Sequence, residues 1–197
     1  MNLRSRPSFF APLAAAALMS ACATPGTPET SAASPATDDP IHRHALVRQA
    51  APAPEWARLR MTLNEATRNT PGVTVGAGDA QSLKIEIPVA DGFASGSTVI
   101  RPSLAAALDT IAPALASEAG VAIKVVGHTD SQGSEMVNLR LSIDRAEAVV
   151  AYLAGRGIAF ERLTADGRGE ADPLTSNATE EGRARNRRVE LLLRAAR

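Results

Sequence analysis

The sequence has little cysteine, few aromatic residues and no net charge. Its single cysteine, Cys22, excludes an intramolecular disulfide and a thiol-rich metal site. Aromatic residues make up 3% of the chain, too few for a surface on which single-stranded nucleic acid would stack. The 21 Lys and Arg residues equal the 21 Asp and Glu residues, so no basic excess is available to displace counterions from phosphates. We therefore expect no nucleic-acid partner.

Enough apolar material is present for one ordinary domain with appendages, since 45% of the 197 residues are hydrophobic. The first residues have the pattern of a targeting segment. Arg4 and Arg6 give a positive start, and the apolar run from Phe9 to Met19 that follows is too short to span a bilayer. We predict a signal peptide over residues 1–21.

The segment Leu18-Met19-Ser20-Ala21-Cys22 resembles a bacterial lipobox, in which the leader is cleaved before a diacylated cysteine. The resemblance implies a lipoprotein with palmitate-type acyl chains on Cys22, and two or three such chains anchor a protein stably in a membrane. By resemblance to Gram-negative sorting rules, Ala23 favours the outer membrane. Met19 departs from the usual Leu, and the alternative is an ordinary secretory leader cut at Ala21 or Ala23, with Cys22 incidental.

Two short segments follow the cysteine. Residues 22–54 are rich in Pro, Ser, Thr and Ala, so we predict a disordered tether with an average reach on the order of 30 Å. We interpret His42 and His44 as solvated tether residues rather than as metal ligands. Residues 55–70 carry apolar side chains at helical spacing and are predicted to form a short amphipathic helix that docks on the domain or mediates self-association.

From residue 71 to 197, strand and helix patterns alternate. Helices are expected from Pro102 with a kink at Pro113, over 135–154 and over 179–187. Strands are expected over 73–75, 83–89, 121–126, 163–167 and 189–193, with Arg187 starting the last one. The order ββαβαβαβ predicts an α/β domain with a mixed β-sheet and helices packed on one face.

Four motifs stand in order within this domain. They are Gly127-His128-Thr129-Asp130, Asn138-Leu139-Arg140-Leu141-Ser142-Ile143-Asp144-Arg145-Ala146, Gly167-Arg168-Gly169-Glu170 and Asn186-Arg187-Arg188-Val189-Glu190. Together they resemble the OmpA C-terminal-like family of peptidoglycan-binding domains, shared with the peptidoglycan-associated lipoprotein Pal and the stator protein MotB. The resemblance covers about residues 80 to 194.

The residues allow a physical interpretation beside the resemblance. Asp130 follows a strand, so its carboxylate is expected at the rim of the sheet. On the next helix, Asn138 and Arg145 lie within about 20° of each other on the flank of the apolar stripe. We expect that buried stripe to consist of Leu139, Ile143, Ala146, Val150 and Leu153. Asn138 and Arg145 would then converge with Asp130.

The resemblance implies what this site binds. Diaminopimelate in peptidoglycan stem peptides carries an ammonium and a carboxylate on one carbon; Asp130 would accept from the ammonium, and Arg145 would hold the carboxylate in a bidentate fork. Asn138 and Arg187 would add contacts. The alternative is a structural ion pair between the aspartate and the arginines.

Further candidates for the pocket wall are Phe93, Ser95 and Thr129. The family often has Phe-Asp where this chain has Phe93-Ala94, so one acceptor is lost, and Ser95 or Ser97 would compensate poorly. This departure puts affinity or ligand preference in doubt, but not the fold.

The sequence contains no signal for catalysis. His128 is the domain's only histidine, no metal-ligand spacing or nucleophile motif accompanies it, and we interpret it as a turn residue that hydrogen-bonds locally. We expect no enzyme activity, no cofactor and no metal.

The functional hypothesis is an outer-membrane lipoprotein with its domain in the periplasm, which tethers the membrane to the cell wall by binding peptidoglycan. The alternative is an envelope scaffold whose main partners are other envelope proteins. An enzyme acting on the wall is a distant third.

Overall fold

The computed structural model describes residues 53–196, except 79–80 and 95. The predicted signal peptide, the lipidation of Cys22, nearly all of the predicted tether and the pocket candidate Ser95 lie outside the described residues. No described helix has the length and apolar character needed to cross a membrane.

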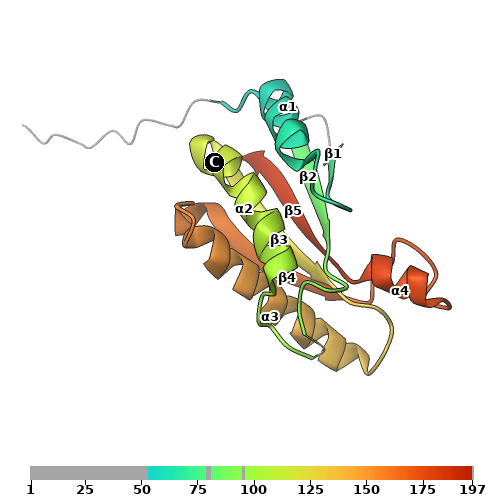
Figure 1. The fold of residues 1–197 in the computed structure, drawn as a ribbon. Helices are drawn as coiled ribbons and strands as arrows, with labels where there is room; N and C mark the ends of the chain where they lie inside the picture. The colour runs from blue at the N-terminus through green and yellow to red at the C-terminus, as the bar shows by residue number, and fades with distance from the viewer. Residues whose placement is uncertain (1–52, 79–80, 95, 197) are drawn as a thin grey trace, which may run out of the picture. The chain divides into compact units, whose positions relative to one another are not determined.

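The described elements follow the predicted order (Figure 1). After the helix α1 (Trp56–Thr67), the strands and helices alternate as ββαβαβαβ, which confirms the predicted fold class. The strands are β1 (Thr74–Ala77), β2 (Ser82–Pro88), β3 (Val121–His128), β4 (Leu163–Gly169) and β5 (Arg188–Ala195). The helices are α2 (Pro102–Ser117), α3 (Glu135–Ala154) and α4 (Glu180–Asn186), with a 3-10 turn η1 (Phe160–Arg162) before β4.

The five strands form one mixed sheet in the order β1-β2-β5-β3-β4. Only β3 and β4 run parallel, and the other neighbours are antiparallel. The last strand, β5, lies between β2 and β3. This order places the ends of β2 and β3 and the start of β5 at the same edge of the sheet, where the motif residues meet.

One face of the sheet is apolar and covered by helices. Leu191 of β5 lies between Ile85 of β2 and Val125 of β3, and all three side chains are fully buried. The helices α2 and α3 run across this face in Figure 1, and α1 packs beside α2 through Leu59 and Leu63. Residues 55–70 were predicted to dock on the domain or to mediate self-association, and the structure shows docking on the domain.

The opposite face carries charged side chains in pairs. Lys84 and Glu86 alternate with the buried residues of β2, and their charged atoms lie 2.5 Å apart. Lys124 of β3 lies 2.7 Å from Asp166 of β4. The strands therefore alternate between apolar and charged positions because only one face meets the helices.

The predicted buried stripe of α3 is wrong in its first turns. Leu139 is 41% exposed, whereas Asn138 and Ser142 are buried. The reason is that α3 lies directly on the strand backbones there: a Cβ added to Gly127 would come within 2.1 Å of the Ser142 carbonyl oxygen. Only small or hydrogen-bonded side chains fit at such an approach, and the Ser142 hydroxyl accepts from the Gly169 N–H at 2.9 Å.

Arg187 also lies differently from the prediction. It is the C-terminal cap of α4 and not the first residue of β5, because its N–H donates to the Arg183 carbonyl and closes the last helical turn. Its carbonyl accepts from the N–H of Val89 at 2.9 Å. The backbone of Arg187 thus joins α4 to the end of β2 and fixes where its side chain starts.

Candidate functional site

A cavity of about 510 Å³ opens at the edge where β2 and β3 end. Asp130 comes from the turn after β3, Asn138 and Arg145 from α3, and Arg187 from the end of α4. The cavity is lined by Val89, Ala90, Phe93, Gly96, Arg101, Thr129, Asp130, Gln132, Val137, Asn138, Leu141, Arg145 and Arg187. The structure therefore brings together all four predicted peptidoglycan-binding residues.

The carboxylate of Asp130 is held in place from two sides. One oxygen accepts from the Gln132 N–H at 3.0 Å, and the other accepts from Arg187 Nη1 at 2.6 Å. The Asp130 side chain is 10% exposed, so the remaining lone pairs face the cavity and not bulk water. Arg187 in turn contacts Glu180 at 2.8 Å. The aspartate and this arginine form the structural ion pair that was the alternative interpretation.

Arg145 is in a different situation. Its residue is only 7% exposed, yet no carboxylate pairs with it among the residues that the structure describes. Its guanidinium donates to the backbone carbonyls of Ser97 at 3.1 Å and Ala94 at 3.3 Å, and stands 5.0 Å from the centre of the Phe93 ring. Burial lowers the pKa of Arg145, partly offset by Asp130. A buried cation that makes no ion pair is costly, and an anionic ligand would relieve that cost.

Asn138 supports the loops around the cavity. Its side-chain amide donates to the carbonyls of Asp130 at 3.2 Å and Gln132 at 3.1 Å, and to the Glu170 carboxylate at 2.7 Å. These contacts join the first, second and third motifs. The donors of this side chain hold the loops around the cavity, and its predicted contact with the ligand stays a prediction.

Two further candidates lie in the cavity wall. Phe93 is 3% exposed and lies against Arg145. Thr129 lines the cavity, and its hydroxyl oxygen is buried without a hydrogen-bond partner in the described part of the chain. The Ser97 hydroxyl accepts from the Val99 N–H at 3.1 Å, so it does not replace the carboxylate missing at Ala94.

Sequence reasoning missed several lining residues, chiefly Arg101, Gln132 and Val137. Arg101 precedes Pro102, the first residue of α2. Its position next to that proline was the sequence signal that could have placed it beside the cavity. Gln132 lies between Asp130 and Gly133 in the same turn, so proximity in sequence could have indicated it.

The interpretation of His128 as a turn residue that hydrogen-bonds locally is wrong. His128 ends β3, is 4% exposed, and neither ring nitrogen has a hydrogen-bond partner within the described residues. Burial lowers its pKa to about 4, assisted by the positive charges of Arg188 and Arg168 and opposed by Glu190 and Asp172. The imidazole is therefore neutral at neutral pH.

The lowered pKa of His128 predicts that the fold becomes less stable in acid. An unfolded histidine protonates near pH 6.5 but the folded one only near pH 4, so the unfolded state binds the proton first as the pH falls. The free energy of unfolding should drop by roughly 3 kcal/mol between pH 7 and pH 4 through this group. Urea unfolding of wild type and His128→Gln across this range measures the difference. Parallel pH profiles for the two proteins would rule this group out as the cause.

The side chains that meet at the cavity are mostly charged groups. Among residues 53–78, 81–94 and 96–196, no group of three or more His, Cys, Asp or Glu side chains could hold a metal ion. One carboxylate and three guanidinium groups converge at the cavity. Such a set can hold a small charged group by electrostatics and hydrogen bonds.

Comparison with known proteins gives consistent matches. The family model described as "OmpA family" matches residues 92–187. The chain is 36% identical over 131 residues to a probable lipoprotein, YiaD, of Escherichia coli (strain K12), across 66% of this chain and 59% of the relative. It is 32% identical over 157 residues to the peptidoglycan-binding protein ArfA of Mycobacterium bovis, across 77% of this chain and 48% of the relative. The chain thus spans only about half of these relatives.

A solved structure extends the comparison to the fold. The cell wall anchor of the T6SS from Pseudomonas aeruginosa is 31% identical, with a TM-score of 0.61. The match covers 73% of this chain and 99% of that structure.

Proposed function

The chain belongs to the OmpA family through residues 92–187, and from that membership we propose that it binds peptidoglycan and catalyses no reaction. The observation that carries the proposal is the pair of opposite charges in one cavity of about 510 Å³. Asp130 offers carboxylate lone pairs, and Arg145 offers a buried guanidinium that lacks a carboxylate among the described residues.

The ligand that fits this pair is a zwitterion. The free end of diaminopimelate in a stem peptide places an ammonium and a carboxylate on one carbon. The ammonium would bind Asp130, and the carboxylate would bind Arg145, whose hydrogen bonds within the described structure run to backbone carbonyls.

The proposal includes the rest of the chain. A signal peptide over 1–21, a lipid anchor on Cys22 and a tether over 22–54 would hold the domain of residues 71–197 in the periplasm beneath the outer membrane. The protein would then join the outer membrane to the cell wall non-covalently. The resemblance to a probable lipoprotein supports the anchor.

Co-sedimentation with insoluble cell-wall sacculi tests this function. Full-length protein in detergent should pellet with diaminopimelate-type sacculi, and free L-Ala-γ-D-Glu-meso-diaminopimelate should return it to the supernatant. Lysine-type sacculi serve as the matched control and should retain less protein, because the lysine side chain lacks the carboxylate that makes the free end of diaminopimelate a zwitterion.

Two results would count against the proposal. Failure to pellet with either wall type would reject peptidoglycan binding, and equal pelleting without competition by the peptide would reject the diaminopimelate site. Release of soluble muropeptides during the incubation would indicate an enzyme instead.

A further inference from the structure

The cavity carries more positive charge than its one carboxylate can balance. Three arginines and one aspartate line it. Arg187 pairs with this aspartate at 2.6 Å and with Glu180, outside the lining, at 2.8 Å, so even with both carboxylates counted the arginines leave a positive excess. Two guanidinium groups, those of Arg101 and Arg145, have no carboxylate partner among the described residues. The cavity therefore favours a ligand with net negative charge over one that is neutral overall.

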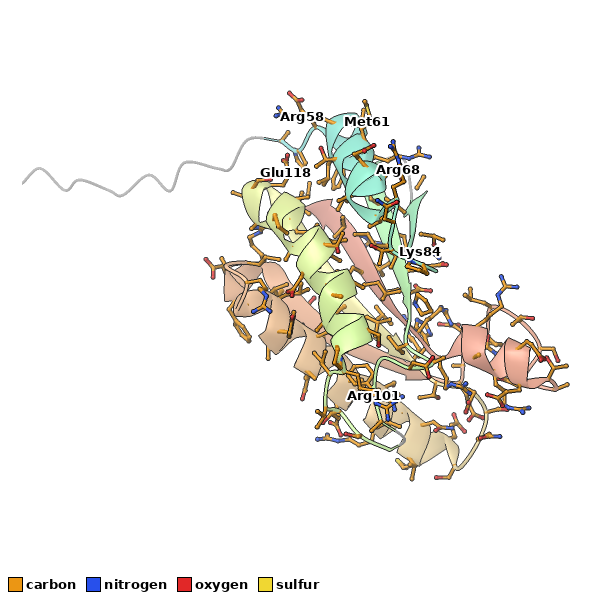
Figure 2. The ribbon with its side chains drawn as sticks, viewed as in Figure 1. Arg58, Met61, Arg68, Lys84, Arg101 and Glu118 are labelled. Atoms are coloured by element: carbon orange, nitrogen blue, oxygen red, sulfur yellow. The ribbon has the colours of Figure 1, made fainter. Side chains whose placement is uncertain are left out.

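The backbone of Arg101 is held at the start of α2 (Figure 2). Its N–H donates to the Gly92 carbonyl at 2.9 Å, and it occupies the N-cap position of the helix without a side-chain cap hydrogen bond. Its residue is exposed and no hydrogen bond or ion pair engages its side chain in the described structure. The guanidinium is therefore able to meet a ligand at the rim, whereas Arg145 acts deeper in the cavity.

A zwitterionic amino-acid centre leaves the excess positive charge of the cavity in place, because the charges of its ammonium and carboxylate cancel. A second carboxylate in the same peptide would compensate the charge of Arg101. In the stem peptide, the γ-linked D-glutamyl residue next to diaminopimelate carries such a group on its α-carbon. Its amidation to isoglutamine removes the charge and keeps the shape.

We propose that Arg101 is a specificity-determining residue that selects stem peptides whose D-glutamyl carboxylate is free over those in which it is amidated. This inference rests on the proposed function, since it assumes that the cavity binds a stem peptide. Because Arg101 is exposed, the preference is modest and decreases with salt.

Titration of full-length protein in detergent with two synthetic tripeptides tests the proposal. The probes are L-Ala-γ-D-Glu-meso-diaminopimelate and L-Ala-γ-D-isoglutaminyl-meso-diaminopimelate. Wild type should bind the first about fivefold more tightly, and Arg101→Gln should reduce this ratio to about one. Arg60→Gln on α1 removes the same charge from an exposed residue outside the cavity, and should keep the fivefold ratio.

The outcomes separate this inference from the function on which it rests. If wild type binds both peptides equally, or if Arg101→Gln keeps the preference, the role of Arg101 is wrong while peptide binding stands. If wild type binds neither peptide, both proposals fail. A preference that disappears between about 0.05 M and about 0.5 M salt supports the electrostatic origin, and one that persists in full contradicts it.

Discussion

Replacing Arg145 by alanine is expected to reduce binding to diaminopimelate-type sacculi by about 100-fold. The substitution removes the one buried guanidinium of the cavity that has no carboxylate partner in the described residues, and leaves the ligand carboxylate beside Phe93 without a counter-charge. Co-sedimentation across a range of sacculus concentrations, with full-length protein in detergent, measures the change in affinity.

The same substitution should hardly alter stability. It loses hydrogen bonds to the carbonyls of Ser97 and Ala94, but it also removes a desolvated charge that makes no ion pair within the described residues. We expect the free energy of unfolding to change by less than about 1 kcal/mol. A residue that stabilises the fold would behave in the opposite way, with a large loss of stability and a secondary loss of binding.

Two variants sharpen this comparison. Arg140→Ala removes an arginine from the same helix, where it is 74% exposed and pairs with Asp144 at 3.0 Å, and should pellet like wild type. Arg145→Lys keeps the charge but loses the planar fork, and should bind with an affinity between those of wild type and Arg145→Ala. If Arg145→Ala pellets as fully as Arg140→Ala, the cavity is not the peptidoglycan site.

The fold could be predicted from the sequence because each element has a local signal. The helix α3 was expected at the bounds that the structure shows, Glu135–Ala154, since Gly155 and Gly157 follow its apolar repeat. The alternation of β2 and β5 reflects the apolar and charged faces of the sheet. Local patterns of this kind need no knowledge of tertiary contacts.

Which face of the first turns of α3 is buried could not be predicted in the same way. Helical periodicity assigned Leu139 to the core because leucine is apolar. The strand glycines Gly127 and Gly167 instead lie against Ser142, and Gly169 lies against the backbone of Asn138 and Leu139, so Asn138 and Ser142 are buried and the Leu139 side chain is exposed. A glycine in a strand does not indicate which helix will pack against it. Tertiary contact therefore determined which face of the first turns was buried.

The site was predicted as a set of residues but not as a set of interactions. The motifs identified Asp130, Asn138, Arg145 and Arg187, and all of them line one cavity. Their pairing depends on side-chain geometry that sequence spacing does not contain: Asp130 pairs with Arg187, and Arg145 turns to backbone carbonyls. The motif residues thus divide into ligand-facing groups and groups that hold the loops together.

Asn186 of the fourth motif exemplifies the second kind, and its replacement by alanine should lower the free energy of unfolding by about 3 kcal/mol. The side chain is fully buried and lies outside the cavity lining. Its oxygen accepts from the N–H groups of Leu174 and Thr175 at 2.9 and 3.1 Å, and its amide donates to Thr175 and Asn177 at 2.8 Å each. Alanine would leave these groups unsatisfied in a partly buried loop.

Urea unfolding measures this effect, with Asn64→Ala on the exposed face of α1 as the matched control, expected within about 0.5 kcal/mol of wild type. Asn186 immediately precedes Arg187, whose guanidinium holds Asp130, so a loosened loop should also weaken sacculus binding. That loss should stay near tenfold, smaller than for Arg145→Ala, because Asn186 itself does not reach the ligand. A variant as stable as Asn64→Ala, but as defective in binding as Arg145→Ala, would show instead that Asn186 acts on the ligand, and would reverse the division between loop-holding and ligand-facing residues.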